Sequence, residues 1–131
     1  MPEARHDAGG VTGLGQIAIS VKDVERATAF YRDVVGLQLL FTAPPGLAFL
    51  QCGAVRVMLA RPEKEGEPQG SSVLYFSVPD IQAAYRRMKE RGAKFEDKPH
   101  LIAKMPTHDL WMVFFRDTEA NLMGMMSEVA N

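Results

Sequence analysis

Two histidines eight residues apart are the side chains of this 131-residue chain best suited to proton transfer or metal binding. His100 and His108 stand on either side of Pro106, and Asp109 follows His108 directly. An imidazole titrates near neutral pH, so either histidine is a candidate general acid, general base or metal ligand. Pro106 weakens a geometry in which both would share one strand face, and the spacing matches no compact metal motif. Nothing in the sequence places a carboxylate to orient either ring, so two interpretations stay open: catalytic or metal-binding residues, or loop histidines that face solvent or are hydrogen-bonded.

A second group of residues is suited to recognising an organic molecule. Arg56 falls on a predicted strand, and a guanidinium that faces a pocket needs an anionic partner. That partner could be a ligand carboxylate, phosphate or enolate, or it could be Glu119; alternatively the side chain reaches solvent at the strand end. Tyr75 and Trp111 could stack on a planar ligand or serve as core aromatics.

Methionine is frequent, with eight residues in the chain. Flexible thioethers adapt to irregular apolar shapes, which suits both core packing and the capture of varied small molecules. We expect core packing for Met123 and Met125, whereas Met58 and Met126 fit either role.

An internal repeat positions these residues. The segment IAISVKDV from Ile17 corresponds to LYFSVPDI from Leu74, and each copy continues into a helix-like stretch that ends at a glycine, Gly36 or Gly92. Such a repeat predicts one supersecondary unit used twice, because neither copy alone could bury its apolar face. We therefore expect function where the two halves meet.

Each copy is predicted to run from a strand through an Asp-capped helix into further strands. In the first copy the helix follows Asp23, and the strands are 14–21, 38–42, 47–52 and 55–60. In the second copy the helix follows Asp80, and the strands are 71–78, 94–96, 100–105, 110–116 and 122–127. The polar segment 61–70, rich in proline, glycine and glutamate, is the predicted linker.

Length and composition predict a single domain at 13–131, with module one at 13–60, module two at 71–128 and a flexible tail at 1–12. The net charge of −1, without any basic run, argues against nucleic acid as a partner. The tail lacks the apolar region of a signal peptide, and no apolar run reaches the ~20 residues of a membrane span. Cys52 is the only cysteine, which excludes an internal disulfide and fits a cytoplasmic protein.

The segment FYRDVVGL (Phe30–Leu37) and the turn Asp117–Asn121, within a tandem βαβββ pattern, resemble the vicinal oxygen chelate superfamily. That family includes glyoxalase I, extradiol dioxygenases and the bleomycin resistance proteins, and the resemblance covers residues 14–128. It implies an α+β fold in which two tandem βαβββ modules form a curled mixed sheet around a pocket, often completed by a symmetric homodimer. Because the family hosts several chemistries, the fold alone does not give the function.

Metal-dependent members of the family carry four inward-facing ligands, and the resemblance places these positions at Gln16, Met58, Val73 and Gly124. Gln16 supplies an amide, whereas the other three lack the nitrogen or oxygen donors that Fe, Mn, Ni or Zn require. We therefore predict that the usual metal site is absent and that no cofactor is bound. The alternative is one divalent metal at a relocated site.

Strand alternation assigns the residues on the same side as these four positions to a ligand pocket. This lining is small and mostly apolar, which suits an organic ligand better than an ion. With the two stacking candidates, the predicted pocket consists of Gln16, Ala18, Arg56, Met58, Val73, Tyr75, Trp111, Leu122, Gly124 and Met126. The opposite parity is predicted to pack under the helices and comprises Ile17, Ile19, Val57, Leu59, Leu74, Phe76, Met123 and Met125.

The turn before the last strand departs from its relatives, which commonly have glycine where this chain has Ala120. If the position requires a positive φ, the turn is strained here and glycine would stabilise it.

The leading hypothesis is a small-molecule-binding protein that lacks the usual metal site and takes an apolar organic ligand, with an anionic group as an option. The alternative is an enzyme: a glyoxalase-like lyase or isomerase, or a dioxygenase, using His100 or His108 with or without a relocated divalent metal. A third reading is a subunit or regulatory module with a vestigial pocket. Whether the chain is an enzyme stays open at this stage.

Overall fold

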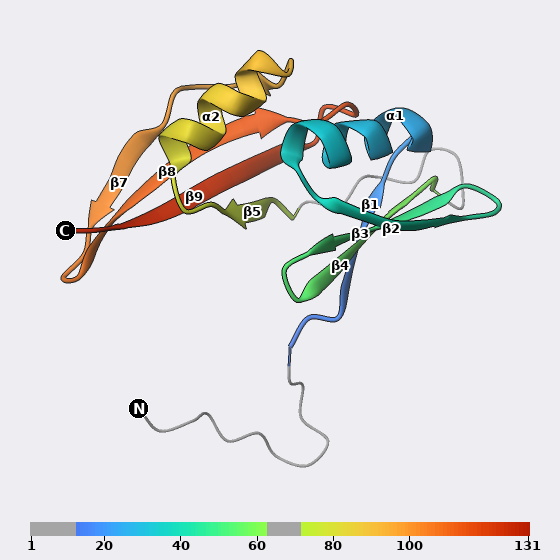
Figure 1. Cartoon of the computed structure of the whole chain (residues 1–131), viewed down its shortest axis with the longest axis horizontal. Helices are drawn as coiled ribbons and strands as arrows, with labels where there is room; N and C mark the ends of the chain where they lie inside the picture. Colours follow the sequence, from blue (N-terminus) through green and yellow to red (C-terminus); the bar gives the residue numbers. More distant parts are fainter. Residues whose placement is uncertain (1–12, 63–71) are drawn as a thin grey trace, which may run out of the picture.

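The computed structural model describes residues 13–62 and 72–131 and shows two successive strand–helix–strand modules (Figure 1). The predicted tail, 1–12, and most of the predicted linker, 63–70, lie outside the described residues. Module one contains β1 (Gln16–Ser20), α1 (Val24–Ala29), the π-helical turn η1 (Phe30–Val35), β2 (Gln38–Ala43), β3 (Leu47–Cys52) and β4 (Val55–Ala60). Module two contains β5 (Leu74–Ser77), α2 (Ile81–Glu90), β6 (Lys94–Phe95), β7 (His100–Lys104), β8 (His108–Arg116) and β9 (Leu122–Ala130).

Both helices begin where the sequence predicts. The Asp23 carboxylate accepts a hydrogen bond from the Arg26 N–H at 3.0 Å, and Asp80 accepts one from the Ala83 N–H at 3.1 Å. Each side chain satisfies a backbone donor that the first turn of a helix leaves unpaired. Gly36, at a φ of 98°, ends the first helical segment in the left-handed conformation that glycine adopts without strain.

The second half of the first helical segment differs from the regular α-helix that its periodicity predicts. From Phe30 onward it is π-helical, and the Gly36 N–H donates to the Tyr31 carbonyl five residues earlier. The widened turn lets two successive aromatic side chains reach module two: the Phe30 ring lies 6.3 Å from that of Phe115, and the Tyr31 hydroxyl reaches Asp117. Apolar spacing cannot distinguish the two helix types, because the tertiary contacts select the wider turn.

The strands form one hydrogen-bonded sheet in each module, where the sequence predicts a single curled sheet. The order is β1-β4-β3-β2 in module one and β5-β9-β8-β6 in module two, where β7 also pairs with β8. The first strand of each module runs parallel to the last, and the remaining pairs are antiparallel. The mixed α+β architecture is as predicted.

One face of each sheet packs against the helices, which lie on the same side of the strands (Figure 1). The alternation predicted from the sequence is confirmed, since the strand residues predicted to pack under the helices are buried or pack against the core. A continuous core joins the modules through Tyr31, Val57, Leu59, Phe76, Val113, Phe115 and Met125. In the described ranges, no helix is long and apolar enough to cross a membrane.

Candidate functional site

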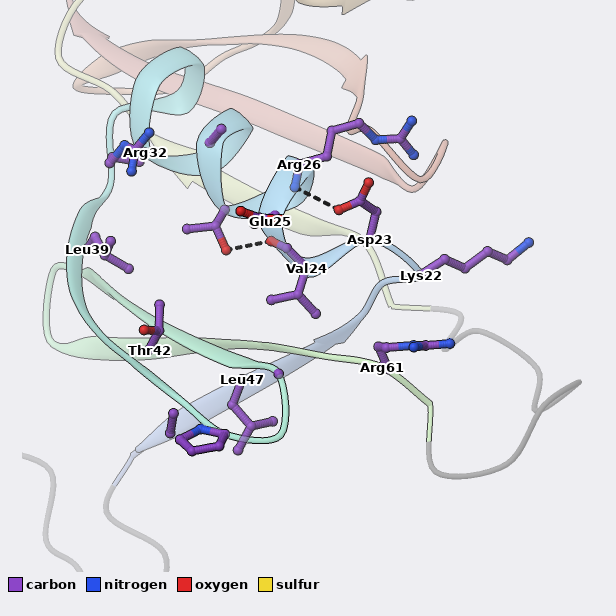
Figure 2. A pocket seen from close by; sticks show the side chains of 15 residues that line it. Lys22, Asp23, Val24, Glu25, Arg26, Arg32, Leu39, Thr42, Leu47 and Arg61 are labelled. Atoms are coloured by element: carbon purple, nitrogen blue, oxygen red, sulfur yellow. Dashed lines mark hydrogen bonds between the residues drawn. The ribbon is translucent and has the colours of Figure 1, made fainter.

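A groove of about 1140 Å³ lies between α1 and the β2–β3 hairpin (Figure 2). None of the ten residues predicted to line a ligand pocket lies there. Two of its polar side chains serve α1 itself: Asp23 accepts from the Arg26 N–H, and the Thr28 hydroxyl donates to the Val24 carbonyl at 2.6 Å. The groove is therefore not the predicted site.

Most of the predicted pocket residues lie on the faces of the two sheets that point away from the helices, here called the open faces. In module one, Ala18 lies beside Met58 across β1 and β4. In module two, Tyr75 lies beside Gly124, and Ser77 lies beside Met126. Residues aligned in this way share a face of the sheet, while their neighbours along each strand point into the core.

A polar cluster occupies the open face of module one. The Arg56 Nε donates to the Gln16 Oε1 at 2.9 Å, and the Gln16 amide nitrogen lies 3.8 Å from the Met58 sulfur. The Arg56 guanidinium lies 5.4 Å from the centre of the Phe49 ring, within the range of a cation–π contact. Glu119, one of the partners considered for Arg56, lies elsewhere and binds Arg26. In the described chain the charge of Arg56 is thus held by an amide and a ring and is left available to an anion.

A tyrosine ring covers Gly124 on the open face of module two. A Cβ atom at this position would lie 2.9 Å from the Tyr75 Cδ2 and 3.2 Å from the Phe114 Cε1. The Tyr75 and Phe114 rings meet edge to face, with centroids 5.7 Å apart, and Tyr75 is 47% exposed. Because any side chain at 124 would displace these rings, Gly124 is required for the aromatic surface formed by Tyr75 and Phe114.

A cleft of about 350 Å³ lies where module one meets module two. It runs between β1 and the β5–β9 pair, and Ala18, Val73 and Leu122 line it together with neighbouring residues. The cleft therefore collects three of the predicted residues, and the polar cluster and the aromatic surface lie in the modules on either side.

Trp111 is the exception among the ten. It pairs with Ser127 and shares the parity of the fully buried Val113, so its ring packs against the core on the helix-covered face. The prediction that Trp111 lines the same pocket as Tyr75 is wrong, because the sheet separates the two rings. The sequence-based prediction included Trp111 because its ring could stack on a ligand. The register of β8 decides on which face of the sheet that ring lies.

The two histidines lie on adjacent strands. His100 opens β7 opposite Met112, and His108 opens β8 opposite Ala130. Each has a nearby carboxylate that the sequence does not reveal: His100 Nδ1 is 3.4 Å from Asp97, and His108 Nε2 is 3.9 Å from Glu128. Met112, the residue opposite His100, lies four residues from His108 along β8, roughly 13 Å, so the two histidines do not form one site.

The residues present do not fit a divalent metal at the four positions that the resemblance assigns to ligands. Only Gln16 offers an oxygen there, and its Oε1 already accepts from Arg56. Elsewhere in ranges 13–62 and 72–131, no group of three or more His, Cys, Asp or Glu side chains could hold a metal ion. Burial raises the pKa of the Cys52 thiol, which makes its thiolate less accessible.

Sequence reasoning missed three aromatic residues on the open faces. Phe49 pairs with Met58, Phe41 stacks on Phe49 with ring centroids 4.6 Å apart, and Phe114 pairs with Gly124. The alternation of residues along 47–52 and 110–116 indicates which side chains share a face of their strand. It assigns these rings to the open faces only when the register against the neighbouring strands is known.

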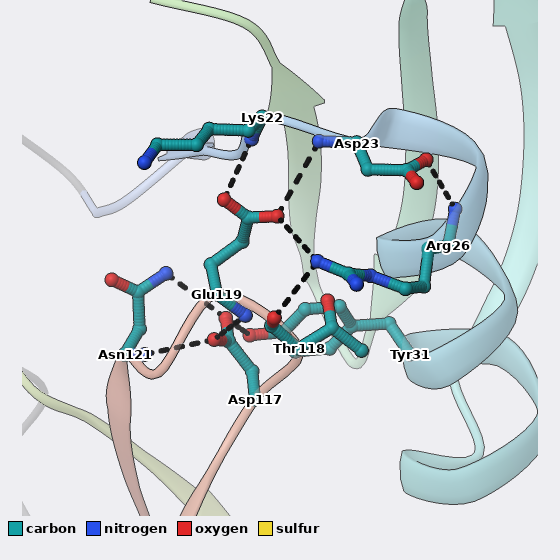
Figure 3. A network of polar contacts seen from close by, with 8 residues as sticks. All are labelled: Lys22, Asp23, Arg26, Tyr31, Asp117, Thr118, Glu119 and Asn121. Atoms are coloured by element: carbon teal, nitrogen blue, oxygen red, sulfur yellow. Dashed lines mark hydrogen bonds and ion pairs between the residues drawn. The ribbon is translucent and has the colours of Figure 1, made fainter.

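A buried hydrogen-bond network, here called the intermodule network, fixes module one against module two (Figure 3). The Tyr31 hydroxyl donates to the Asp117 Oδ2 at 2.7 Å, and the other Asp117 oxygen accepts from the backbone N–H groups of Glu119 and Asn121. Burial and the neighbouring Asp117 carboxylate raise the pKa of Tyr31, so the phenol stays protonated. Asp117 therefore joins the η1 segment to the turn before β9.

The Glu119 carboxylate extends this network to the start of α1 (Figure 3). Its side chain is only 4% exposed and accepts from the Lys22 N–H at 2.7 Å and from the Asp23 N–H at 3.3 Å. Arg26 completes the contact by donating to Glu119 and to the Thr118 carbonyl. The network holds together the ends of β1 and β9, which flank the cleft.

Comparisons with known proteins agree with this architecture. The chain is 28% identical over 123 residues to an uncharacterised protein, YraH, of Bacillus subtilis strain 168, covering 84% of this chain and 94% of YraH. It superposes with a TM-score of 0.71 on TnmS3, an antibiotic binding protein from Streptomyces sp. CB03234, at 22% identity over 90% of this chain and 97% of TnmS3. A lactoylglutathione lyase from Agrobacterium tumefaciens gives a TM-score of 0.70 at 22% identity over 89% of this chain and 94% of the lyase.

These structural likenesses show the fold alone, since a binding protein and an enzyme match about equally well. The family is given by the sequence itself, because the family model matches residues 13–123, which include module one and all of module two up to the start of β9. The chain belongs to the Glyoxalase/Bleomycin resistance protein/Dioxygenase superfamily.

Proposed function

We propose that this protein binds an apolar, planar organic molecule on its open faces and does so without a divalent metal ion. The observation that carries the proposal is the Tyr75 ring, which lies over Gly124 at the position where metal-dependent relatives are expected to carry their fourth ligand. An aromatic ring there offers a stacking surface in place of a carboxylate.

The polar cluster of module one suits an anionic group on the ligand. Arg56 carries its charge on the open face beside Gln16 and Phe49, and a guanidinium is well suited to bind a carboxylate or sulfonate. The likeness to TnmS3, named as an antibiotic binding protein, is consistent with ligand capture by this fold. The lone Cys52, half-buried, is consistent with a reducing cytoplasm.

A homodimer is part of the proposal. Several large apolar side chains on the sheets and their edges are more than a third exposed, among them Leu40, Phe41, Tyr75, Leu101 and Ile102. A second copy would remove this surface from water and would enclose a ligand that a single chain leaves exposed.

The test is a fluorescence titration with anilinonaphthalenesulfonate, an anionic aromatic probe, beside its uncharged analogue N-phenylnaphthylamine. Tyr75→Ala is expected to weaken both probes about threefold to tenfold, because each loses an aromatic stacking partner. Arg56→Met is expected to weaken only the anionic probe. Gln82→Ala, on the exposed side of α2, is the matched control and is expected to change neither. Equal affinities in all four proteins would overturn the proposal.

An enzyme is the second candidate, favoured by the carboxylates found beside His100 and His108. A carboxylate can orient an imidazole for proton transfer or for metal binding. Thermal unfolding in the presence of Fe(II), Mn, Ni or Zn tests this alternative. Stoichiometric stabilisation that disappears in His100→Ala or His108→Ala would replace the binding proposal with a relocated catalytic metal site.

A further inference from the structure

A row of soft metal donors crosses the open face of module two. His100 on β7 lies opposite Met112 on β8, and Met112 lies opposite Met126 on β9. Opposite residues of an antiparallel pair share a face, with Cα atoms about 4.5–5.5 Å apart. One imidazole and two flexible thioethers are thus side by side on three neighbouring strands. Met112 and Met126 are half-buried, and His100 is 46% exposed, so the row is accessible from solvent in a single chain.

The contacts of His100 prepare its ring for metal binding. Its Nδ1 lies 3.0 Å from the Lys98 carbonyl oxygen and 3.4 Å from an Asp97 carboxylate oxygen. A carbonyl only accepts hydrogen bonds, so the proton of the neutral ring sits on Nδ1 and Nε2 keeps its lone pair. Ligand histidines in metal sites are held in this way, by a carbonyl or carboxylate on the second nitrogen.

Asp97 is itself held in place. Its other carboxylate oxygen accepts from the Phe114 N–H at 3.1 Å, which ties Asp97 to β8. The histidine, its supporting carboxylate and the strand that carries Met112 therefore form one connected unit.

We propose that His100, Met112 and Met126 form a binding site for a soft monovalent cation, Cu(I) or Ag(I). Thioether ligands select such soft ions and imidazole also binds copper, whereas hard divalent ions prefer oxygen donors. All three ligands are uncharged, so the charge of the bound ion is not neutralised at the site. A single unneutralised charge costs less free energy of desolvation than the double charge of a divalent ion. None of the three residues belongs to the four positions of the family's usual metal site. Binding of the cation does not require the proposed organic ligand.

The experiment uses full-length protein with Cys52→Ala, which removes the competing thiol, and silver nitrate in chloride-free buffer. Methionine methyl groups labelled with carbon-13 report binding by NMR. One Ag(I) per chain is expected to shift two methyl signals, and these signals should be the ones missing from Met112→Leu and Met126→Leu spectra. Methionine-to-leucine changes conserve volume and are expected to preserve folding.

Affinity is measured by competition for Cu(I) with bicinchoninate under anaerobic conditions. Met112→Leu, Met126→Leu and His100→Gln are each expected to weaken binding at least about tenfold. The matched controls, Met105→Leu and His108→Gln, lie on the same hairpin outside the row and are expected to bind like the parent protein. Absence of binding, equal binding by all variants, or methyl shifts at other methionines would each overturn the site.

Discussion

At the scale of single residues, Ala120 and Gly124 show opposite backbone demands on either side of the start of β9. Ala120 has a φ of 65°, in the left-handed region that glycine favours. Gly124 has ordinary strand geometry but no room for a side chain, because the Tyr75 and Phe114 rings lie against it. The first position lacks a glycine that its conformation favours, and the second keeps a glycine for steric reasons.

Replacing Ala120 with glycine is expected to stabilise the protein. The left-handed conformation destabilises a residue with a Cβ by about 1–2 kcal/mol, and glycine avoids this strain. Part of the gain is lost again, because glycine makes the unfolded chain more flexible and so stabilises it. We expect Ala120→Gly to raise the free energy of unfolding by about 0.5–1 kcal/mol and the melting temperature by a few degrees. Differential scanning calorimetry measures both.

Ala83→Gly is the matched control for this prediction. Ala83 is exposed in α2, where glycine should lower stability by about 1 kcal/mol. A loss of stability in both variants would show that the turn gains nothing from glycine.

At the scale of elements, the η1 segment and the turn before β9 depend on each other through Tyr31 and Asp117. The widened helical turn brings the Tyr31 hydroxyl to a carboxylate that also accepts from the backbone of the 117–121 turn. The η1 segment thus supplies a donor to the Asp117 carboxylate, and the turn supplies an acceptor to the buried Tyr31 hydroxyl. This contact helps to hold the turn before β9 against module one.

Removing the Tyr31 hydroxyl is expected to change both the stability and its dependence on pH. Tyr31→Phe should lower the free energy of unfolding by about 1.5–3 kcal/mol at neutral pH, because a hydrogen bond to a charged group is lost. Burial, followed by the Asp117 contact, raises the pKa of Tyr31 above its ordinary value of 10.0. The stabilisation linked to this raised pKa is complete below about pH 10 and declines as the pH rises further, since the unfolded phenol then loses its proton while the folded one keeps it.

The measurement is urea unfolding between about pH 7 and about pH 11.5. Above about pH 10, Tyr31 is expected to contribute a fall of about 1.4 kcal/mol per pH unit to the free energy of unfolding. Tyr31→Phe should lack this contribution, so the difference between the two proteins should shrink as the pH rises. A constant difference across the range would contradict the assignment.

At the scale of the whole molecule, the two sheets are covered on one side and open on the other. The helices bury one face of each sheet, whereas Phe41 and Tyr75 stay 48% and 47% exposed. Such side chains cost free energy in contact with water, which supports the proposed second copy over the open faces.

Sedimentation equilibrium is expected to give a mass of about 29 kDa, twice the 14.5 kDa of one chain. Phe41→Asp places a charge on the open face and should shift the protein toward the monomer, because an unpaired charge is costly in an apolar interface. Gln82→Asp adds the same charge on the exposed side of α2 and should leave the dimer unchanged. A monomer at all concentrations, or a dimer unaffected by Phe41→Asp, would contradict this assembly.

The sequence by itself determined the repeated module, the caps at Asp23 and Asp80, and the side of each sheet on which most strand residues lie. These features depend on short-range periodicity and on single capping residues, both of which can be read along one strand or helix. The sequence also shows that Met58, Val73 and Gly124 carry no nitrogen or oxygen side-chain ligand for a metal, once the resemblance assigns the ligand positions to them.

Only the tertiary structure decided which residues meet across strands. Register placed Trp111 on the covered face, set Phe49 beside Met58 and aligned His100 with Met112 and Met126. Packing between modules selected the wide turn at Phe30 and the contact of Tyr31 with Asp117. Such pairings join residues far apart in the chain, and a shift of one residue in register would reverse every face, so local patterns cannot fix them.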